Sequence, residues 1–265
     1  MMHNPADPPQ HGDAQQEIRQ RAKSPQQKAL RRQQILDAAA RRFSEAAFDK
    51  VNLVEIATDV GITKAALYRY FRSKETLFLA LYVQQLAELV DSAEALDRSL
   101  DPADACVTVI EQHPLFLRLN AILHGVLEQN LTVDEARAFK TELLPLMARF
   151  AQQLSDWLGI TPAAAIRWLM HCQASMIGCW HIAYPAANAR EVMQQPPFDV
   201  LQVEFSEVFR QHIRWLVDGL LRQHGADLNS PDASDNSSAD NSAPDNSAAD
   251  QSPPNISSNA AGNTP

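Results

Sequence analysis

The spacing of apolar residues along the chain predicts helices throughout and gives no support for strands. After Ser24-Pro25, a typical helix start, Ile35, Ala39 and Phe43 recur at every fourth position, which is the period of one helix face. Further apolar runs of the same period follow, most of them opened by a residue type that caps helices. One of these helices begins after Asn52, and the later predicted ranges are 63–71, 75–100, 102–113, 114–130, 133–158, 162–184 and 198–223.

Two segments at the ends of the chain lack this pattern. Residues 1–23 are rich in Gln, Pro, Asp and Ala and predict a disordered arm. Residues 226–265 approximate a repeat of DNSSA, DNSAP and DNSAA and hold no aromatic residue, Lys or Arg. Such a composition cannot bury enough apolar surface to fold, so we expect a disordered low-complexity tail that is more often inert than partner-binding.

Composition and cysteine use indicate a globular chain from a reducing compartment. Of the 265 residues, 45% are hydrophobic, and glycine is scarce, as expected for an all-α protein with a sizeable core. Three cysteines are too few for a disulfide framework, and the polar N-terminus does not look like a secretory signal. We therefore expect a cytoplasmic protein.

One uncharged stretch, residues 168–189, is long enough to span a membrane. It contains His171, His181 and Pro185, which are costly in lipid. We therefore expect a helix buried between protein surfaces and no membrane partner.

The net charge of −9 hides an asymmetry along the chain. Residues 1–74 carry 13 Lys and Arg against 8 Asp and Glu, whereas residues 75–225 carry 10 against 18. A basic head on an acidic body indicates an anion-binding region joined to a body with another task.

The basic region contains a pattern typical of a helix-turn-helix. Two short helices are joined by Val60-Gly61-Ile62, where glycine permits the left-handed backbone of a tight turn. The second helix exposes its N-terminal residues, and free N–H groups at a helix start suit phosphates or base edges. The predicted core of this unit comprises Ile35, Ala39, Phe43, Ile56, Val60, Ile62, Leu67 and Phe71.

This segment resembles the DNA-binding domain of the TetR/AcrR family of bacterial regulators. The resemblance spans about 50 residues, through the pattern IL-x-AA-x3-F followed by IA-x3-G-I-T-K-x2-LY-x-YF-x-SKE-x-LF. It implies an all-α fold in which a three-helix domain with a helix-turn-helix (24–74) precedes a helical ligand-binding and dimerisation domain (75–225).

The resemblance also implies which residues face DNA. Lys74 would contact a phosphate, Ala66 would permit close approach, and Arg69 is a further candidate. For the two tyrosines, packing in the small core is the alternative. The full predicted DNA-binding set is Thr63, Lys64, Ala65, Ala66, Tyr68, Arg69, Tyr70 and Lys74.

Three departures from the family pattern bear on these expectations. Ala47-Phe48 stands where the family usually has glycine before the aromatic, and would strain a turn that needs a positive φ. Val51-Asn52 replaces Thr-Ser or Thr-Thr, although Asn52 can still cap the next helix. Ala65-Ala66 replaces Gly-Thr, so any operator sequence borrowed from relatives is in doubt.

The acidic body predicts a homodimer and an effector site. The family resemblance implies that the helix at 162–184 and the last helix pair with their copies, and the lack of charge from 168 to 184 independently indicates burial. Such a pairing would let two recognition helices read a palindrome. Asn120, His124 and Glu128 stand four residues apart and predict one polar line on an apolar helix, whose members could contact a ligand, bond to one another and to their neighbours, or face water. Further effector candidates, for which packing is the alternative, are Trp168, His171, Met176 and Trp180.

Metal and enzyme chemistry find little support in the sequence. His171, Cys172, Cys179 and His181 lack the spacing of a zinc site, and no phosphate loop, G-x-S-x-G or H-E-x-x-H motif occurs. We therefore expect no metal, cofactor or catalytic residue. The predicted function is a DNA-binding transcriptional regulator, a repressor released from a palindromic operator by a small molecule. The alternative is a helical interaction protein whose acidic body or tail binds a protein partner.

Overall fold

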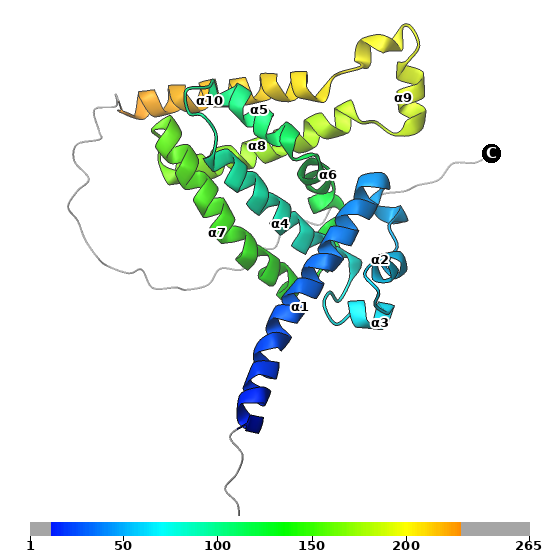
Figure 1. The fold of residues 1–265 in the computed structure, drawn as a ribbon. Helices are drawn as coiled ribbons and strands as arrows, with labels where there is room; N and C mark the ends of the chain where they lie inside the picture. Colours follow the sequence, from blue (N-terminus) through cyan, green and yellow to red (C-terminus); the bar gives the residue numbers. More distant parts are fainter. Residues whose placement is uncertain (1–11, 229–265) are drawn as a thin grey trace, which may run out of the picture. The chain divides into compact units, whose positions relative to one another are not determined.

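The computed structural model describes residues 12–228, with side chains described from 25 to 223, and every regular element in this range is helical (Figure 1). The long helices are α1 (Gly12–Glu45), α4 (Lys74–Glu94), α7 (Val133–Leu158), α8 (Pro162–Ala183) and α10 (Phe205–Leu228). The shorter ones are α2 (Leu53–Asp59), α3 (Lys64–Leu67), α5 (Pro102–Gln112), α6 (Pro114–Ile122) and α9 (Ala187–Met193). Single turns occur at η1 (Phe48–Lys50), η2 (Leu123–Leu127) and η3 (Phe198–Leu201). The all-α prediction is confirmed.

The C-terminal half of α1 packs with α2 and α3 around a small apolar core. Ile35, Ala39 and Phe43 are buried there against Ile56 and Leu67, as predicted. Phe71 is also buried, whereas Val60 and Ile62 lie at the edge and are only partly covered. This core packs the two helices of the helix-turn-helix against α1.

The body is a helical bundle in which α7 packs against α4 and α8, and α6 lies between α4 and α8. Most helix starts are capped as the sequence predicts. Asp101 accepts from the backbone N–H groups of Ala103 and Asp104, at 3.0 and 3.1 Å, and Thr161 accepts from Ala164 at 3.2 Å. Thr132 forms a capping box with Glu135, which satisfies two further N–H groups at the start of α7.

Two predicted boundaries in the first half of the chain are wrong. α1 begins at Gly12, not after Ser24, and Pro25 lies inside it. Gln, Glu, Arg, Ala and Lys dominate residues 15–23 and are strong helix formers, which explains a helix where we expected a disordered arm. Residues 1–11 lie outside the described residues. The second shift is in α3, which ends at Leu67 instead of Phe71 because tight turns replace the helix, with Tyr70 N donating to the Leu67 carbonyl at 2.8 Å.

Further boundaries differ in the body. α4 ends at Glu94, not near residue 100, because Asp97 starts a turn by accepting from the Ser99 N–H at 2.9 Å. α6 ends at Ile122 and continues as the π-helical turn η2. The final helix begins at Phe205 instead of 198, after the extended backbone of Gln202.

Residues 187–197, expected as a loop, contain α9, and residues 198–201, expected as the start of the last helix, form the separate turn η3. Of the tail predicted to be disordered, residues 229–265 lie outside the described residues. None of the helices between residues 12 and 228 is both long and apolar enough to cross a membrane.

Candidate functional site

The helix-turn-helix has the geometry that its sequence predicts. Gly61 adopts a φ of +67°, which only glycine tolerates readily, and the Ile62 N–H donates to the Ala57 carbonyl at 2.9 Å. Asn52 caps α2 by accepting from Val54 N at 2.9 Å, and Thr63 caps α3 by accepting from Ala66 N at 3.1 Å. Glu55, three residues after Asn52, binds Arg42 and does not take part in this cap.

The predicted DNA-facing residues from 63 to 70 lie on this short segment, which we call the recognition segment. Tyr68 is 41% exposed, so it is not a core residue, and the Lys64 Nζ lies 5.8 Å from the centre of its ring. Tyr70 is half-buried against the core, as the alternative reading expected. Thr63, Lys64, Ala65 and Arg69 are exposed, and Ala66 is half-buried.

Lys74 is engaged by the preceding loop. Its Nζ donates to the Phe48 carbonyl and lies 4.2 Å from the centre of the Phe48 ring. Burial lowers the pKa of Lys74 from its ordinary value. The ammonium therefore already has a partner in the loop. A contact between Lys74 and a DNA phosphate stays a prediction.

Three arginines of α1 contact residues that flank the recognition segment. The Arg31 Nη1 donates to the Val60 carbonyl at 2.7 Å, and the Arg32 guanidinium lies 5.2 Å from the centre of the Phe71 ring. Arg42 binds both carboxylate oxygens of Asp59 at 2.8 Å, a bidentate contact that ties α1 to α2. Ala47 has an extended backbone with a φ of −68°, so the departure from the family's glycine causes no strain.

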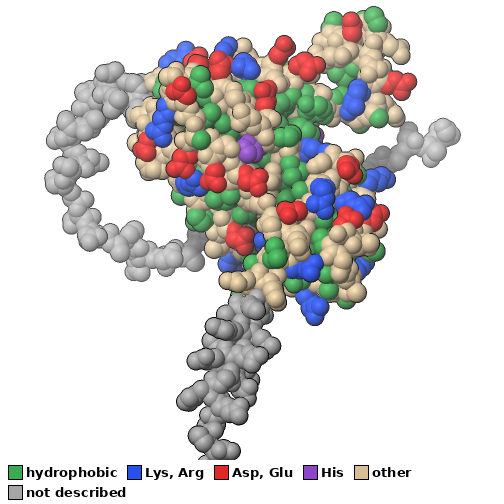
Figure 2. Space-filling view, viewed as in Figure 1, with side chains coloured by type: hydrophobic (Ala, Val, Ile, Leu, Met, Phe, Trp, Pro, Cys, Tyr) green, Lys and Arg blue, Asp and Glu red, His purple; other side chains and the backbone are tan. Residues whose placement is uncertain are grey.

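Lys and Arg side chains are spread over the region of α1, α2 and α3, at the lower right of the space-filling view (Figure 2). Asp and Glu side chains are more frequent over the bundle above it. The charge asymmetry of the sequence is therefore also visible on this face of the molecule.

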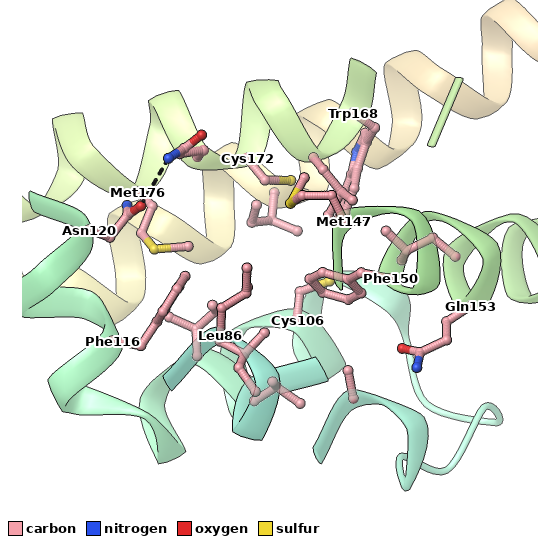
Figure 3. Close-up of a pocket in the computed structure, with 18 of the residues that line it drawn as sticks. Leu86, Cys106, Phe116, Asn120, Met147, Phe150, Gln153, Trp168, Cys172 and Met176 are labelled. Carbon is pink, nitrogen blue, oxygen red and sulfur yellow. Dashed lines mark hydrogen bonds between the residues drawn. The ribbon is translucent and has the colours of Figure 1, made fainter. Parts of the chain in front are cut away.

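A cavity of about 100 Å³ lies inside the body, between α4, α5, α6, α7, α8 and α10 (Figure 3). Its walls are mostly apolar. The sulfur-bearing and aromatic side chains that dominate the view are Cys106, Phe116, Met147, Phe150, Cys172 and Met176.

A few polar groups project into this apolar space. Asn120 is 1% exposed, and its Oδ1 accepts from Gln173 Nε2 at 3.2 Å and from the Tyr82 hydroxyl at 3.4 Å. Burial raises the pKa of the Tyr82 hydroxyl well above its ordinary value, and burial raises that of the Cys106 thiol to about 12. These groups therefore keep their protons at neutral pH, and the wall between them is uncharged.

Three of the predicted effector residues line the cavity: Asn120, Trp168 and Met176. The predicted polar line Asn120, His124 and Glu128 is wrong. The π-helical turn η2 shifts the register, so Asn120 points inward while the side chain of His124 is 52% exposed.

His124 and Glu128 form a surface cluster instead. Glu128 binds His124 Nδ1 at 2.8 Å and Lys140 Nζ at 2.5 Å. Burial opposes ionisation of Glu128 most strongly, but the hydrogen bonds from Lys140 and His124 together hold its pKa below the ordinary value. The remaining two candidates also lie off the cavity wall: His171 is exposed, and Trp180 packs with its ring centre 4.3 Å from that of Tyr184.

Sequence reasoning missed the residues that α4, α5 and α7 contribute. Gln153 was the detectable one, because it interrupts the apolar positions Met147, Phe150, Leu154 and Trp157 of one helix face. A polar residue on such a face often points into a cavity or a buried network.

Helix α6 connects the cavity wall to the helix-turn-helix domain. Phe116 and Asn120 line the cavity, and Arg118 between them reaches the end of α1. The Arg118 Nη atoms donate to the carbonyls of Ser44 at 2.6 Å and Ala46 at 3.1 Å, and its guanidinium lies 4.8 Å from the centre of the Phe43 ring. Arg118 therefore links α6 directly to the end of α1.

Comparisons with known proteins match both parts of the chain. Residues 35–81 match the family described as bacterial regulatory proteins, tetR family, and residues 79–224 match the tetracyclin repressor-like C-terminal domain. The HTH-type transcriptional repressor Rv1474c of Mycobacterium tuberculosis is 42% identical over 53 residues, which are 20% of this chain and only 28% of that relative. The nucleoid occlusion factor SlmA of Shewanella oneidensis is 26% identical over 132 residues, covering 49% of this chain and 67% of that protein.

Solved structures with a similar arrangement include two from Streptomyces coelicolor. A tetR-family transcriptional regulator is 17% identical, with a TM-score of 0.45 over 77% of this chain and 92% of the other. A possible TetR family transcriptional regulator is 22% identical, with a TM-score of 0.47 over 72% and 99%.

The two family matches together cover the helix-turn-helix and nearly the whole body. TetR-family regulators are generally non-enzymatic DNA-binding proteins. The two family matches do not favour the alternative of a protein-interaction module. This chain belongs to the TetR family and is a DNA-binding transcriptional regulator.

Proposed function

We propose that the protein is a homodimeric, cytoplasmic repressor that leaves a palindromic operator when a small molecule enters the cavity. The observation that carries this proposal is the position of α6, which lines the cavity and holds the end of α1 through Arg118. A ligand shifts the equilibrium only by binding one arrangement better than the other. The arrangement that the ligand favours is one in which α6 and α1 hold the two recognition segments of the dimer at a separation that does not match the two operator half-sites.

The exposed face of α8 supports the dimer. Five small or apolar residues stand there at every fourth position and form a stripe along the helix, which we call the α8 stripe: Ile166, Met170, Ala174, Gly178 and Ile182. Ile166, Met170 and Ile182 are 43%, 48% and 55% exposed, and Trp215 of α10 is 61% exposed. A long apolar stripe in water typically marks a protein contact, and a second copy provides a matching one.

The recognition segment supports the DNA-binding part. We assign direct contacts with DNA to Thr63, Lys64, Ala65 and Tyr68, and further contacts to Ala66, Arg69, Tyr70 and Lys74. Lys64 and the tyrosine hydroxyls suit phosphate oxygens, and the alanines suit close approach to a thymine methyl group.

The first test is to sequence genomic fragments retained by the purified full-length protein at moderate and at high salt. We expect one recurrent palindrome, whose preference survives added salt although the affinity falls, because phosphate contacts release counterions. Unselective retention that disappears with salt would contradict an operator and reduce the head to a general DNA-binding surface.

A further inference from the structure

Three buried polar side-chain atoms between residues 25 and 223 have no hydrogen-bond partner, and all three belong to residues that line the cavity. They are Asn120 Nδ2, Trp168 Nε1 and Gln153 Oε1. Buried polar groups in folded proteins are nearly always satisfied, so three exceptions around one space indicate a missing partner within it. Two of the three atoms are donors.

The orientation of Asn120 is set by its own neighbours. Gln173 Nε2 and the Tyr82 hydroxyl both donate to Asn120 Oδ1, from α8 and α4 respectively. Both N–H bonds of the Asn120 amide are thereby left without an acceptor (Figure 3). A side chain that is 1% exposed, held in this way and part of the cavity wall, supplies a donor with a fixed position.

The rest of the wall restricts the occupant further. Asn120 and Trp168 lie on opposite sides of the view in Figure 3, with Met147, Cys172 and Met176 between them. Arg98 supplies the one charged side chain on the cavity wall, and it is exposed to solvent. An ion in the interior would lose its hydration and find no counter-charge, whereas a neutral apolar molecule loses little hydration free energy on entering.

We propose that the cavity binds a small, uncharged, mostly apolar molecule with a carbonyl oxygen, and that Asn120 Nδ2 donates a hydrogen bond to that oxygen. The cavity volume of about 100 Å³ is below the roughly 150 Å³ of an apolar cavity that binds benzene, so we expect a ligand with no more than one ring, around which the flexible side chains of Met147 and Met176 adjust. This inference names the chemical class of the effector. Only its consequence for operator release rests on the proposed function. Binding itself is measured without DNA.

Three matched probes test the chemistry by calorimetric titration of the full-length protein. Acetophenone has the carbonyl, α-methylstyrene replaces its oxygen by a CH2 group of similar shape, and benzoate replaces the methyl group by a charged oxygen. We expect acetophenone to bind about fivefold to tenfold more tightly than α-methylstyrene, the equivalent of one net hydrogen bond. Benzoate should bind more weakly than acetophenone.

Substitution of the donor provides the second arm. In Asn120→Leu the preference for acetophenone over α-methylstyrene should fall to a ratio of about one, because the donor is absent while the apolar wall remains. The matched control is Asn130→Leu, at an exposed asparagine beyond η2, which should keep the ratio of the unmodified protein. Infrared spectroscopy of acetophenone bound to the unmodified protein needs no variant, and its carbonyl stretch should shift to lower frequency than in hexane.

Each failure has a distinct meaning. Equal binding of acetophenone and α-methylstyrene, no binding of either, an unshifted carbonyl stretch, or a preference that survives Asn120→Leu would overturn the inference. If the preference holds but acetophenone leaves operator binding unchanged, the proposed release mechanism is contradicted while the ligand chemistry stands.

Discussion

Lys64 is the exposed cation nearest the start of the recognition helix, and its Nζ lies over the ring of Tyr68. If it contacts a phosphate, Lys64→Ala should lower operator affinity about tenfold and reduce the slope of log affinity against log salt by about 0.9. Fluorescence anisotropy with the selected operator at several salt concentrations measures both quantities.

Lys140→Ala is the control for Lys64→Ala, since Lys140 pairs with Glu128 in the body. It should leave the affinity and the slope unchanged. An operator affinity that is insensitive to Lys64→Ala, with the dimer intact, would remove the assignment of the recognition segment.

Asp104 joins α5 to α10 through Arg210 Nη1 at 2.6 Å and Arg214 Nη2 at 3.2 Å. The hydrogen bond from Arg210 holds the pKa of Asp104 below its ordinary value of 3.8. A carboxyl whose pKa is lower in the folded state stabilises the fold above the unfolded-state pKa, and this stabilisation disappears as the pH falls through the folded-state value.

The stability difference between the unmodified protein and Asp104→Asn should therefore be constant above about pH 5 and shrink as the pH falls below about 4. Thermal unfolding midpoints measured across this range test the prediction. Asp134→Asn, at a carboxylate that pairs only with Arg137 of its own helix, should follow the unmodified protein. A difference that persists at low pH would show that the Asp104 contacts act by packing and not by charge.

Gly178 belongs to the α8 stripe, and a Cβ built on it meets no atom within 4 Å. Gly178→Arg is therefore tolerated by an isolated subunit, while a long charged side chain cannot be packed between two copies of α8. We expect dimer dissociation to become easier by at least about tenfold, seen by analytical ultracentrifugation. Gln152→Arg, at an exposed position of α7, is the matched control and should leave the dimer unchanged. A dimer that tolerates Gly178→Arg would place the interface elsewhere.

At the scale of elements, the sequence predicted most helices but fewer of their ends. Caps such as Asp101, Thr132 and Thr161 are local, because the side chain and the N–H groups it accepts from are within three residues. The π-helical turn has no such local mark, since apolar residues fill both its flanks. Its effect on the predicted site was large, because Asn120 and His124 ended on different faces.

The cavity shows the same limit at the level of the tertiary structure. Asn120 and Trp168 could be named because polar or aromatic residues on apolar helices are conspicuous, and Met176 because it lies on the uncharged helix. Tyr82 and Cys106 could not, since each looks like an ordinary core residue until six helices are brought together. The recognition segment was easier, because its residues are contiguous and its fold depends on one small core.

At the scale of the whole molecule, Arg118 is one contact that joins the cavity wall to the DNA-binding domain, beside the packing of α4 against α1. Arg118→Ala should keep operator affinity and acetophenone affinity within about threefold, because it lines neither site, but should weaken the coupling between them. The ratio of operator affinities without and with saturating acetophenone measures this coupling. We expect a ratio of about five or more in the unmodified protein to fall towards one in the variant.

Arg137→Ala removes a guanidinium that pairs with Asp134 on the surface of α7 and serves as the control for Arg118→Ala. Its coupling ratio should equal that of the unmodified protein. Full release of the operator by acetophenone in Arg118→Ala would show that the signal travels through other contacts, for example the packing of α4 against α1.

The turn at Leu123–Leu127 closes with the Glu128 N–H donating to the Leu123 carbonyl, five residues back, at 3.0 Å. It therefore contains one residue more than an α-helical turn of the same height. A homologous protein with one residue fewer in this turn can still form a continuous α-helix. The cavity-lining residues before Leu123 would keep their positions. In an alignment of related sequences we therefore expect a single-residue gap at this turn. The polar residues in and after the turn, such as His124 and Glu128, are comparable between proteins only when that gap has been placed.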